Sequence, residues 1–239
     1  MAHTELEPTV LKVHESESGQ EGEQQSYRIR PINLNNSREI GVVLKMFLDP
    51  ANKDHISNIR TNMEVSDLVL HYKTPDRHGF VAIDRKGQVV GVFDLTPQGQ
   101  SAETTAPVVL AGGMLNKLCV DSKNQRQKTG PKLRAEAERI AFEEYKWPNL
   151  MAGIVLDENQ TEESRTALEV LGGWGKFIDK YTKTDARGKL FLRDGKWEAR
   201  GTIPDNVFVE STNKFHDVLL IVKTRASWLA EQGIPLEGK

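Results

Sequence analysis

The sequence has very little cysteine: Cys119 is the only one, so no disulfide can form within the chain. A fold that does not depend on disulfides fits a reducing compartment, and we expect a cytoplasmic protein. Cys119 lies between Leu118 and Val120, and a free cysteine in such an apolar stretch is usually a small buried hydrophobe and not a nucleophile. One cysteine and six scattered histidines do not give the spacing of a metal site, so we expect no metal.

The sequence also lacks an excess of charge of one sign and long apolar runs. Lys and Arg number 32 against 34 Asp and Glu, for a formal net charge of −2. A general nucleic-acid-binding protein carries a basic excess on one face, so the composition argues against nucleic acid as a partner. No apolar run approaches the roughly 20 residues that a membrane span needs, and the N-terminus lacks the pattern of a signal peptide. We expect no membrane partner.

Apolar residues are missing from part of the N-terminal region as well. Residues 1–26 are rich in Glu, Gln, Ser and Gly, and the stretch from Glu15 to Ser26 contains no apolar side chain. Such a segment cannot bury enough surface to offset the entropy lost on ordering, which predicts a flexible tail over 1–26. We interpret the remaining residues, 27–239, as one domain.

Helix and strand patterns alternate along this domain. Ile40, Val43, Leu44 and Phe47 have the spacing of one helix face, and positions 35–37 offer N-cap candidates in front of it. We predict strands at 27–31, 79–84, 88–95, 114–120, 151–156, 175–182 and 218–223, helices at 37–49, 56–63, 131–145, 161–171 and around Trp228, a hairpin at 190–200, and a polar loop at 96–107. The stretch 65–69 either extends the second helix or begins another element.

The helix at 131–145 is predicted in most detail. Pro131 suits the first position of a helix, and its buried stripe contains Leu133, Ala137, Ile140, Ala141 and either Phe142 or Tyr145. Strands and helices mixed in this way around one sheet predict an α/β or α+β domain.

A strand, a turn and a helix at the centre of the chain point to a family. An apolar strand that ends at Val120 leads into a polar, basic turn and then into a helix that contains Leu133. This arrangement resembles the central motif of the GNAT acyltransferase superfamily, in which a Q/R-x-x-G-x-G/A turn joins the strand to the helix. Further segments that resemble the family are Ile29–Pro31, Asp157–Asn159, Leu171–Trp174 and Asp217–Lys223. The resemblance implies a GNAT-like mixed, mostly antiparallel twisted sheet flanked by helices, with a hairpin insertion at 184–216.

The resemblance also implies a binding site for acetyl-coenzyme A. A turn rich in backbone N–H groups that feeds a helix N-terminus is an anion site on physical grounds alone, and it suits a pyrophosphate. Counted from Val120, Lys128 stands where the family usually has the first glycine of the turn, and in a register shifted by two residues Lys132 stands at the second glycine. In either register one glycine is lost, so close approach of the backbone is less favoured, although a lysine charge still suits a phosphate. The alternative is a basic loop without a ligand. The implied cofactor-binding residues are Leu118, Val120, Gln125, Arg126, Gln127, Lys128, Thr129, Gly130 and Asn159.

The catalytic residues are less well marked than the coenzyme site. Many family members have a tyrosine as general acid at the position of Leu168, which cannot donate a proton. Tyr181 in the next predicted strand could substitute for it, although a packing role is the alternative. Asn116 on the central strand is the second catalytic candidate, and a backbone N–H at about Val120 would polarise the thioester carbonyl.

Two functions remain open at this point. The first is an N-acyltransferase that moves an acetyl group from acetyl-coenzyme A to an amine acceptor. The second is a GNAT-fold module that has lost catalysis and serves as a structural or interaction component of a larger assembly. The insertion at 184–216 is either a surface hairpin or a contact for a homodimer or an assembly partner.

Overall fold

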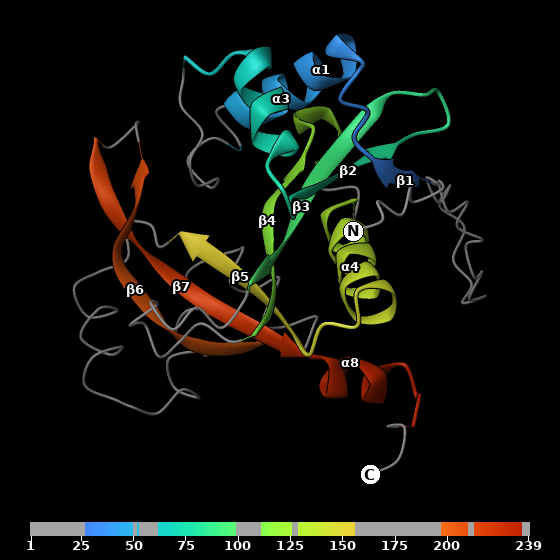
Figure 1. Ribbon diagram of the computed structural model, residues 1–239, viewed down its shortest axis with the longest axis vertical. Coiled ribbons are helices and arrows are strands. Elements are labelled where there is room, and N and C mark those ends of the chain that lie inside the picture. The colour runs from blue at the N-terminus through green and yellow to red at the C-terminus, as the bar shows by residue number, and fades with distance from the viewer. Residues whose placement is uncertain are drawn as a thin grey trace.

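The computed structural model describes residues 27–49, 52, 62–98, 111–125, 129–155, 197–209 and 213–235. These residues form a twisted sheet whose strands are hydrogen-bonded in the order β1-β2-β3-β4-β5-β7-β6 (Figure 1). Its strands are β1 (Arg28–Pro31), β2 (His78–Ile83), β3 (Val89–Gln98), β4 (Gly112–Val120), β5 (Asn149–Val155), β6 (Glu198–Val209) and β7 (Lys214–Thr224). Only β4 and β5 are parallel, and the other neighbouring pairs are antiparallel.

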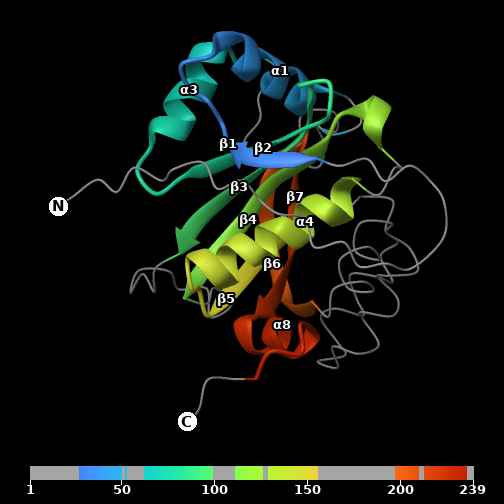
Figure 2. The same cartoon turned by 90° about the vertical axis from the view of Figure 1, so that its right-hand side faces the viewer.

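Helices cover both faces of this sheet (Figure 2). On one face α1 (Ser37–Leu48) and α3 (Val65–Lys73) pack over a core cluster that includes Val81 and Val92. On the other face α4 (Thr129–Arg139) packs over a larger cluster. A last helix, α8 (Arg225–Glu231), follows β7 directly and joins that larger cluster through Trp228. The predicted mixed, mostly antiparallel sheet flanked by helices is confirmed.

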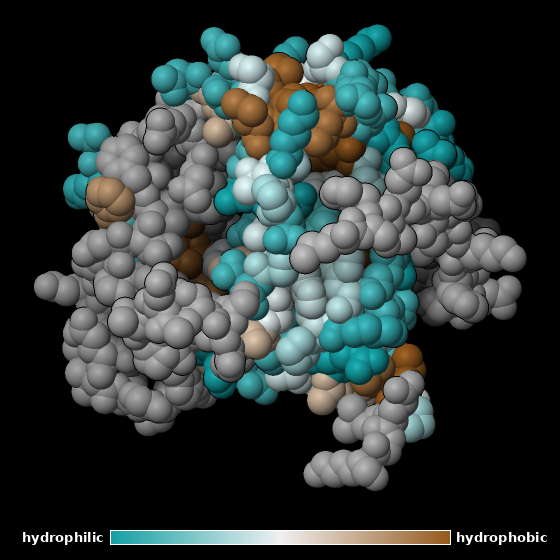
Figure 3. All heavy atoms as spheres, viewed as in Figure 1, coloured by the Kyte–Doolittle hydropathy of each residue, from teal (hydrophilic) through white to brown (hydrophobic). Residues whose placement is uncertain are grey.

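The first helix forms as its sequence predicts. Ile40, Val43 and Phe47 are fully buried, and Asn36 is the N-cap, because its side-chain oxygen accepts a hydrogen bond of 3.2 Å from the backbone N–H of Glu39. Apolar side chains also gather on the outer surface over α1 and α3 (Figure 3), where Leu70 is 66% exposed.

Helix α4 differs from the prediction at both ends. It begins at Thr129, so Pro131 is its third residue and not its first. At its other end the helix continues into a π turn, Ile140–Glu144. A π turn contains an additional residue, and here it buries Ile140 and Phe142 together, whereas Tyr145 is only half-buried.

The predicted loop over 96–107 is wrong in its first part, because β3 continues to Gln98. Thr96, Pro97 and Gln98 pair with the first residues of β4, and backbone pairing of this kind does not require apolar side chains. Within the predicted insertion, Glu198–Val209 is a strand of the main sheet that pairs with β7. The tail 1–26, the helix at 161–171, the strand at 175–182 and the first half of the hairpin at 190–200 lie outside the described residues.

Candidate functional site

The two central parallel strands separate part-way along their length. Gly113–Leu115 of β4 pair with Leu150–Ala152 of β5, and the pairing ends there. Beyond this point β4 stays paired with β3 as far as Val120, and β5 stays paired with β7 as far as Val155. Figure 1 shows the two strands pointing in different directions. Among the residues that the structure describes, the edge of Asn116–Val120 that faces β5 therefore has no strand partner, and an extended ligand could pair with it.

A bulge in β4 lies where the strands part. Val92 pairs with Cys119 and Asp94 pairs with Asn116, so one residue of β3 faces both Lys117 and Leu118 of β4. Lys117 has a φ of 47°, in the left-handed region that costs an ordinary residue about 1–2 kcal/mol. The bulge directs two consecutive side chains to the same face: Asn116 Nδ2 lies 3.4 Å from Thr96 Oγ1, and Lys117 Nζ lies 3.1 Å from Asp94 Oδ2.

Asp94 is the centre of a buried polar network. It is 1% exposed, and it accepts hydrogen bonds from Tyr72 Oη at 2.6 Å and from Lys117 Nζ at 3.1 Å. Burial alone would raise the pKa of the Asp94 carboxyl, but the interactions with His71, Lys117 and Tyr72 together lower it. Burial and the same carboxylate hold the pKa of the Tyr72 phenol well above its usual range. The network therefore contains a carboxylate and a protonated phenol.

This network continues from Asp94 toward the surface of the molecule. Lys117 Nζ donates to Nε2 of His71 at 2.9 Å, and Arg77 Nη1 lies 2.9 Å from Nδ1 of the same ring. His71 and Tyr72 come from α3, whereas Asp94 and Lys117 come from adjacent strands. None of these residues was predicted from the sequence as part of a site. The available signal was a charged residue inside each of two otherwise apolar strands.

The end of β4 is fixed by side chains from two other segments. The carbonyl oxygen of Val120 accepts hydrogen bonds from Asn52 Nδ2 at 3.2 Å and from Gln125 Nε2 at 3.3 Å. Gln125 also donates to Asn52 Oδ1 at 3.3 Å. The side chain of Gln125 thus holds the strand end in place. Any contact of this residue with a phosphate would therefore come from its backbone.

The start of α4 lies close to this strand end. The hydroxyl of Thr129 hydrogen-bonds with Tyr27 Oη at 2.9 Å and donates to the carbonyl oxygen of Asn124 at 3.3 Å, so the side chain braces the turn. At Gly130 a Cβ atom would meet only Val120 Cγ2, at 3.8 Å. The protein's own packing therefore does not require glycine at 130. The first backbone N–H groups of a helix have no acceptor within the helix, so those of Thr129 and Gly130 suit an anion.

The structure brings five of the predicted site residues to this region. Leu118 and Val120 lie on the β4 segment beyond the last β5 pair, and Gln125, Thr129 and Gly130 lie in or after the turn that follows. Asn116 lies at the bulge on the same face as Lys117. The remaining predicted site residues fall outside the described part of the chain: Arg126, Gln127, Lys128, Asn159 and Tyr181.

Cys119 is a buried thiol, as the sequence predicts. It is 2% exposed and packs in the core beneath α1 and α3. Burial and the neighbouring Asp94 hold its pKa well above the usual range, so it stays protonated and is a poor nucleophile. Within the residues that the structure describes, no three His, Cys, Asp or Glu side chains gather as metal ligands would. Nor does any described helix have the length and apolarity to cross a membrane.

Comparison with solved structures identifies the fold. A mutant of the spermidine N-acetyltransferase SpeG from Vibrio cholerae superimposes with a TM-score of 0.58 at 10% identity, over 88% of this chain and 99% of that one. An aminoglycoside 6′-N-acetyltransferase complexed with coenzyme A gives a TM-score of 0.54 at 16% identity, over 88% and 99% of the two chains. By sequence, no protein-family model and no curated protein matches the chain.

The protein therefore has the fold of the GNAT acetyltransferases, as the strand-turn-helix motif predicts. The separation of β4 from β5, the bulge at Lys117 and the start of α4 define its candidate active site.

Proposed function

We propose that this protein is an acetyl-coenzyme A-dependent N-acetyltransferase that acts on an amine. The observation that carries the proposal is the loss of pairing between β4 and β5 after Leu115, directly at the bulge and beside the start of α4. Paired strands normally continue until one of them ends, because unpaired backbone groups are costly when they are buried. An opening of this kind in the middle of a sheet suits a ligand that itself offers amide groups.

Coenzyme A would satisfy both parts of this opening. Its pantetheine arm carries amides that would hydrogen-bond to the backbone of Leu118–Val120 where β5 has left it, apart from the Val120 carbonyl, which already accepts from Asn52 and Gln125. Asn159 would also hydrogen-bond with the arm. Its pyrophosphate would lie at the start of α4, against the N–H groups of Thr129 and Gly130. Arg126 and Lys128 would add positive charge there. Gly130 leaves room for the phosphate because it has no Cβ.

The reaction needs an amine, a polarised thioester and a proton transfer. The neutral amine attacks the thioester carbonyl, the carbon–sulfur bond breaks, and one proton passes from the amine nitrogen to the coenzyme A thiolate. A backbone N–H near the bulge would stabilise the oxyanion, which is commonly the largest single contribution to such catalysis. Holding both reactants in line would supply much of the remaining acceleration.

We place the acceptor amine on the face that carries Asn116 and His71. The bulge turns Asn116 toward this face, and the network of Asp94 continues through His71 to it. Asn116 would orient the amine, whereas Asp94 and Lys117 would act as positioning residues that hold the bulge in place. We also propose a cytoplasmic location, where acetyl-coenzyme A is a common metabolite and the single cysteine is not at risk of oxidation.

The test has two stages that separate the open alternatives. Isothermal titration with acetyl-coenzyme A measures binding, and release of free thiol in the presence of an amine panel (diamines, polyamines and aminoglycosides) measures turnover. Binding together with turnover would support the proposal. Binding without turnover on any amine would favour the non-catalytic GNAT module, and no binding at millimolar coenzyme would overturn the cofactor assignment.

A further inference from the structure

A cavity lies at the edge of the sheet, away from the opening between β4 and β5. It has a volume of about 280 Å³. It forms where β1 ends at Pro31. The antiparallel neighbour β2 begins at His78, two residues beyond the partner of Pro31 along that edge. Helix α4 separates the two sites, because its first residues lie beside Val120 whereas Ile140 and Tyr145 line the cavity. The cavity is therefore distinct from the proposed coenzyme site.

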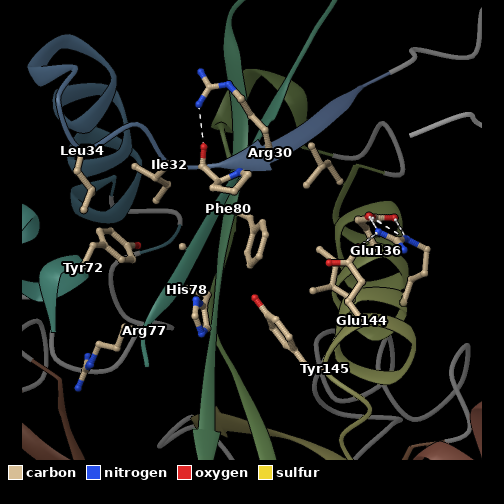
Figure 4. A pocket seen from close by; sticks show the side chains of 15 residues that line it. Arg30, Ile32, Leu34, Tyr72, Arg77, His78, Phe80, Glu136, Glu144 and Tyr145 are labelled. Atoms are coloured by element: carbon tan, nitrogen blue, oxygen red, sulfur yellow. Dashed lines mark hydrogen bonds and ion pairs between the residues drawn. The ribbon is translucent and has the colours of Figure 1, made fainter. Parts of the chain in front are cut away.

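The π turn shapes one wall of this cavity. It places Ile140 and Glu144 on the cavity, together with Tyr145 just beyond it, while Ala141 and Phe142 remain in the core. Interruptions of this kind in a helix occur frequently at functional sites. The opposite wall is aromatic and comes from Tyr72, His78 and Phe80 (Figure 4).

Two polar side chains of the cavity have no hydrogen-bond partner within the described part of the chain. These are the hydroxyl of Tyr145, which points into the space in Figure 4, and the imidazole of His78, whose ring centroid lies 5.2 Å from that of Tyr145. Burial lowers the pKa of His78, so the ring is neutral near pH 7 and offers one donor and one acceptor. Both groups are available to a ligand.

The charges around the cavity favour a cation. On this wall the carboxylates of Glu136 and Glu144 both contact Arg139, which leaves the wall with one net negative charge. Arg30 is neutralised by Glu39, at 2.6 Å. The only other guanidinium that lines the cavity is that of Arg77, and its head points away from the space in Figure 4.

From these observations we propose that the cavity is a binding site for a small organic amine, with its ammonium group against Glu144 and Tyr145 and its apolar body against Phe80 and Ile140. Aromatic faces add attraction for a cation, and apolar walls with a few converging polar groups are typical of ligand sites. A volume of about 280 Å³ equals that of roughly nine liquid waters, which suits an amine of about eight to ten heavy atoms.

The site is tested first by comparing three probes of one shape: benzylamine, benzyl alcohol and benzoate. Trp147 is the reporter, because its ring centroid lies 4.9 Å from that of Tyr145, and the indole signals of Trp197 and Trp228 in a nitrogen-15 NMR spectrum serve as internal controls. We expect a saturable shift of the Trp147 signal at about millimolar benzylamine, an affinity for the alcohol lower by about tenfold, and no response to benzoate. An equal response to amine and alcohol, or no saturable response to the amine, would overturn the proposal.

Two adjacent carboxylates provide a matched pair of variants. Glu143 and Glu144 each give Arg139 one contact, at 3.2 and 2.7 Å, and they have similar exposure, 45% and 37%, but only Glu144 lines the cavity. Glu144→Gln should weaken benzylamine binding by about fivefold, whereas Glu143→Gln should leave it within about twofold. Equal losses in both variants would mean that the probe senses a general negative field and not this site. Because the readout is binding of the amine alone, the result does not depend on whether the protein binds coenzyme A.

Discussion

The ammonium group of Lys117 lies 3.1 Å from the carboxylate of Asp94, and both side chains are almost completely buried, at 5% and 2% exposed. Lys117 is also the bulge residue in the left-handed region. A buried ion pair is not in itself a large source of stability, because both charges lose their hydration. It does hold one particular geometry, since either charge without its partner would be costly. We infer that the pair fixes the bulge of β4 at the point where β4 leaves β5.

Removing one charge of this pair should destabilise the protein strongly. Lys117→Met leaves Asp94 buried without its cation, and we expect the free energy of unfolding to fall by about 3–5 kcal/mol. Adding Asp94→Asn removes the remaining charge and keeps an acceptor for Tyr72, so the double variant should regain at least half of the loss. Urea denaturation of the two single variants and the double variant measures this coupling. Additive losses would contradict a direct interaction between the two side chains.

The free energy of unfolding at acid pH should depend on the ionisation of Asp94. Its native pKa is lowered, so its contribution is complete above the ordinary carboxyl pKa of about 3.9 and is lost as the pH falls through the native value. The difference in unfolding free energy between wild type and Asp94→Asn should therefore be constant above about pH 5 and shrink below about pH 4. A difference that is unchanged at about pH 3 would show that folding does not shift the pKa of this carboxyl, and a difference that grows as the pH falls would show that the carboxyl is neutral in the native state.

Most of the architecture could be predicted from local sequence. The apolar positions of α1 and its cap at Asn36 depend only on residues within a few positions of one another, and the same holds for the hairpin of β2 and β3. The bulge could not be predicted, because Asn116 and Lys117 stand in a stretch that has the composition of an ordinary strand and contains no glycine at the left-handed position. The contact between Asp94 and Lys117 depends on the register of β3 and β4, which the bulge itself sets.

The position of the candidate site along the chain could be predicted from the sequence, but its detailed geometry could not. The turn before α4 indicates an anion site in the sequence, but the hydrogen bonds that Asn52 makes with Val120 and Gln125 join segments that are far apart in the chain. The edge cavity carries no local signal, because it depends on where β1 stops relative to β2 and on a π turn.

Gly130 offers a test of the proposed coenzyme site that leaves the fold intact. In Gly130→Ala the new Cβ would make only an ordinary contact with Val120, so stability should stay equal or rise by up to about 1 kcal/mol. Affinity for acetyl-coenzyme A should fall by about tenfold, because a methyl group would occupy the approach to the helix N-terminus.

The control for this variant is Gly41→Ala in α1. There the new Cβ would meet only Val65 Cγ2, at 4.0 Å, so the change is the same in kind and lies in another helix. It should raise stability by a similar amount and leave the coenzyme affinity unchanged. If Gly130→Ala binds acetyl-coenzyme A as tightly as Gly41→Ala does, the pyrophosphate does not lie at the start of α4.

Comparison of Lys117→Gly with Lys117→Ala separates a positioning role of Lys117 from a direct chemical role. Each variant also carries Asp94→Asn, so that no buried charge is left without a partner. Both changes remove the ammonium group, but only glycine adopts a left-handed φ without steric cost. If the side chain serves to hold the bulge, the glycine variant should retain a kcat about tenfold higher than that of the alanine variant, since the left-handed conformation costs alanine about 1–2 kcal/mol. The KM for acetyl-coenzyme A should change less than kcat, because the phosphate contacts at α4 are untouched. Equal and severe losses of kcat in both variants, in proteins that remain folded, would instead mean that the ammonium group itself takes part in the reaction.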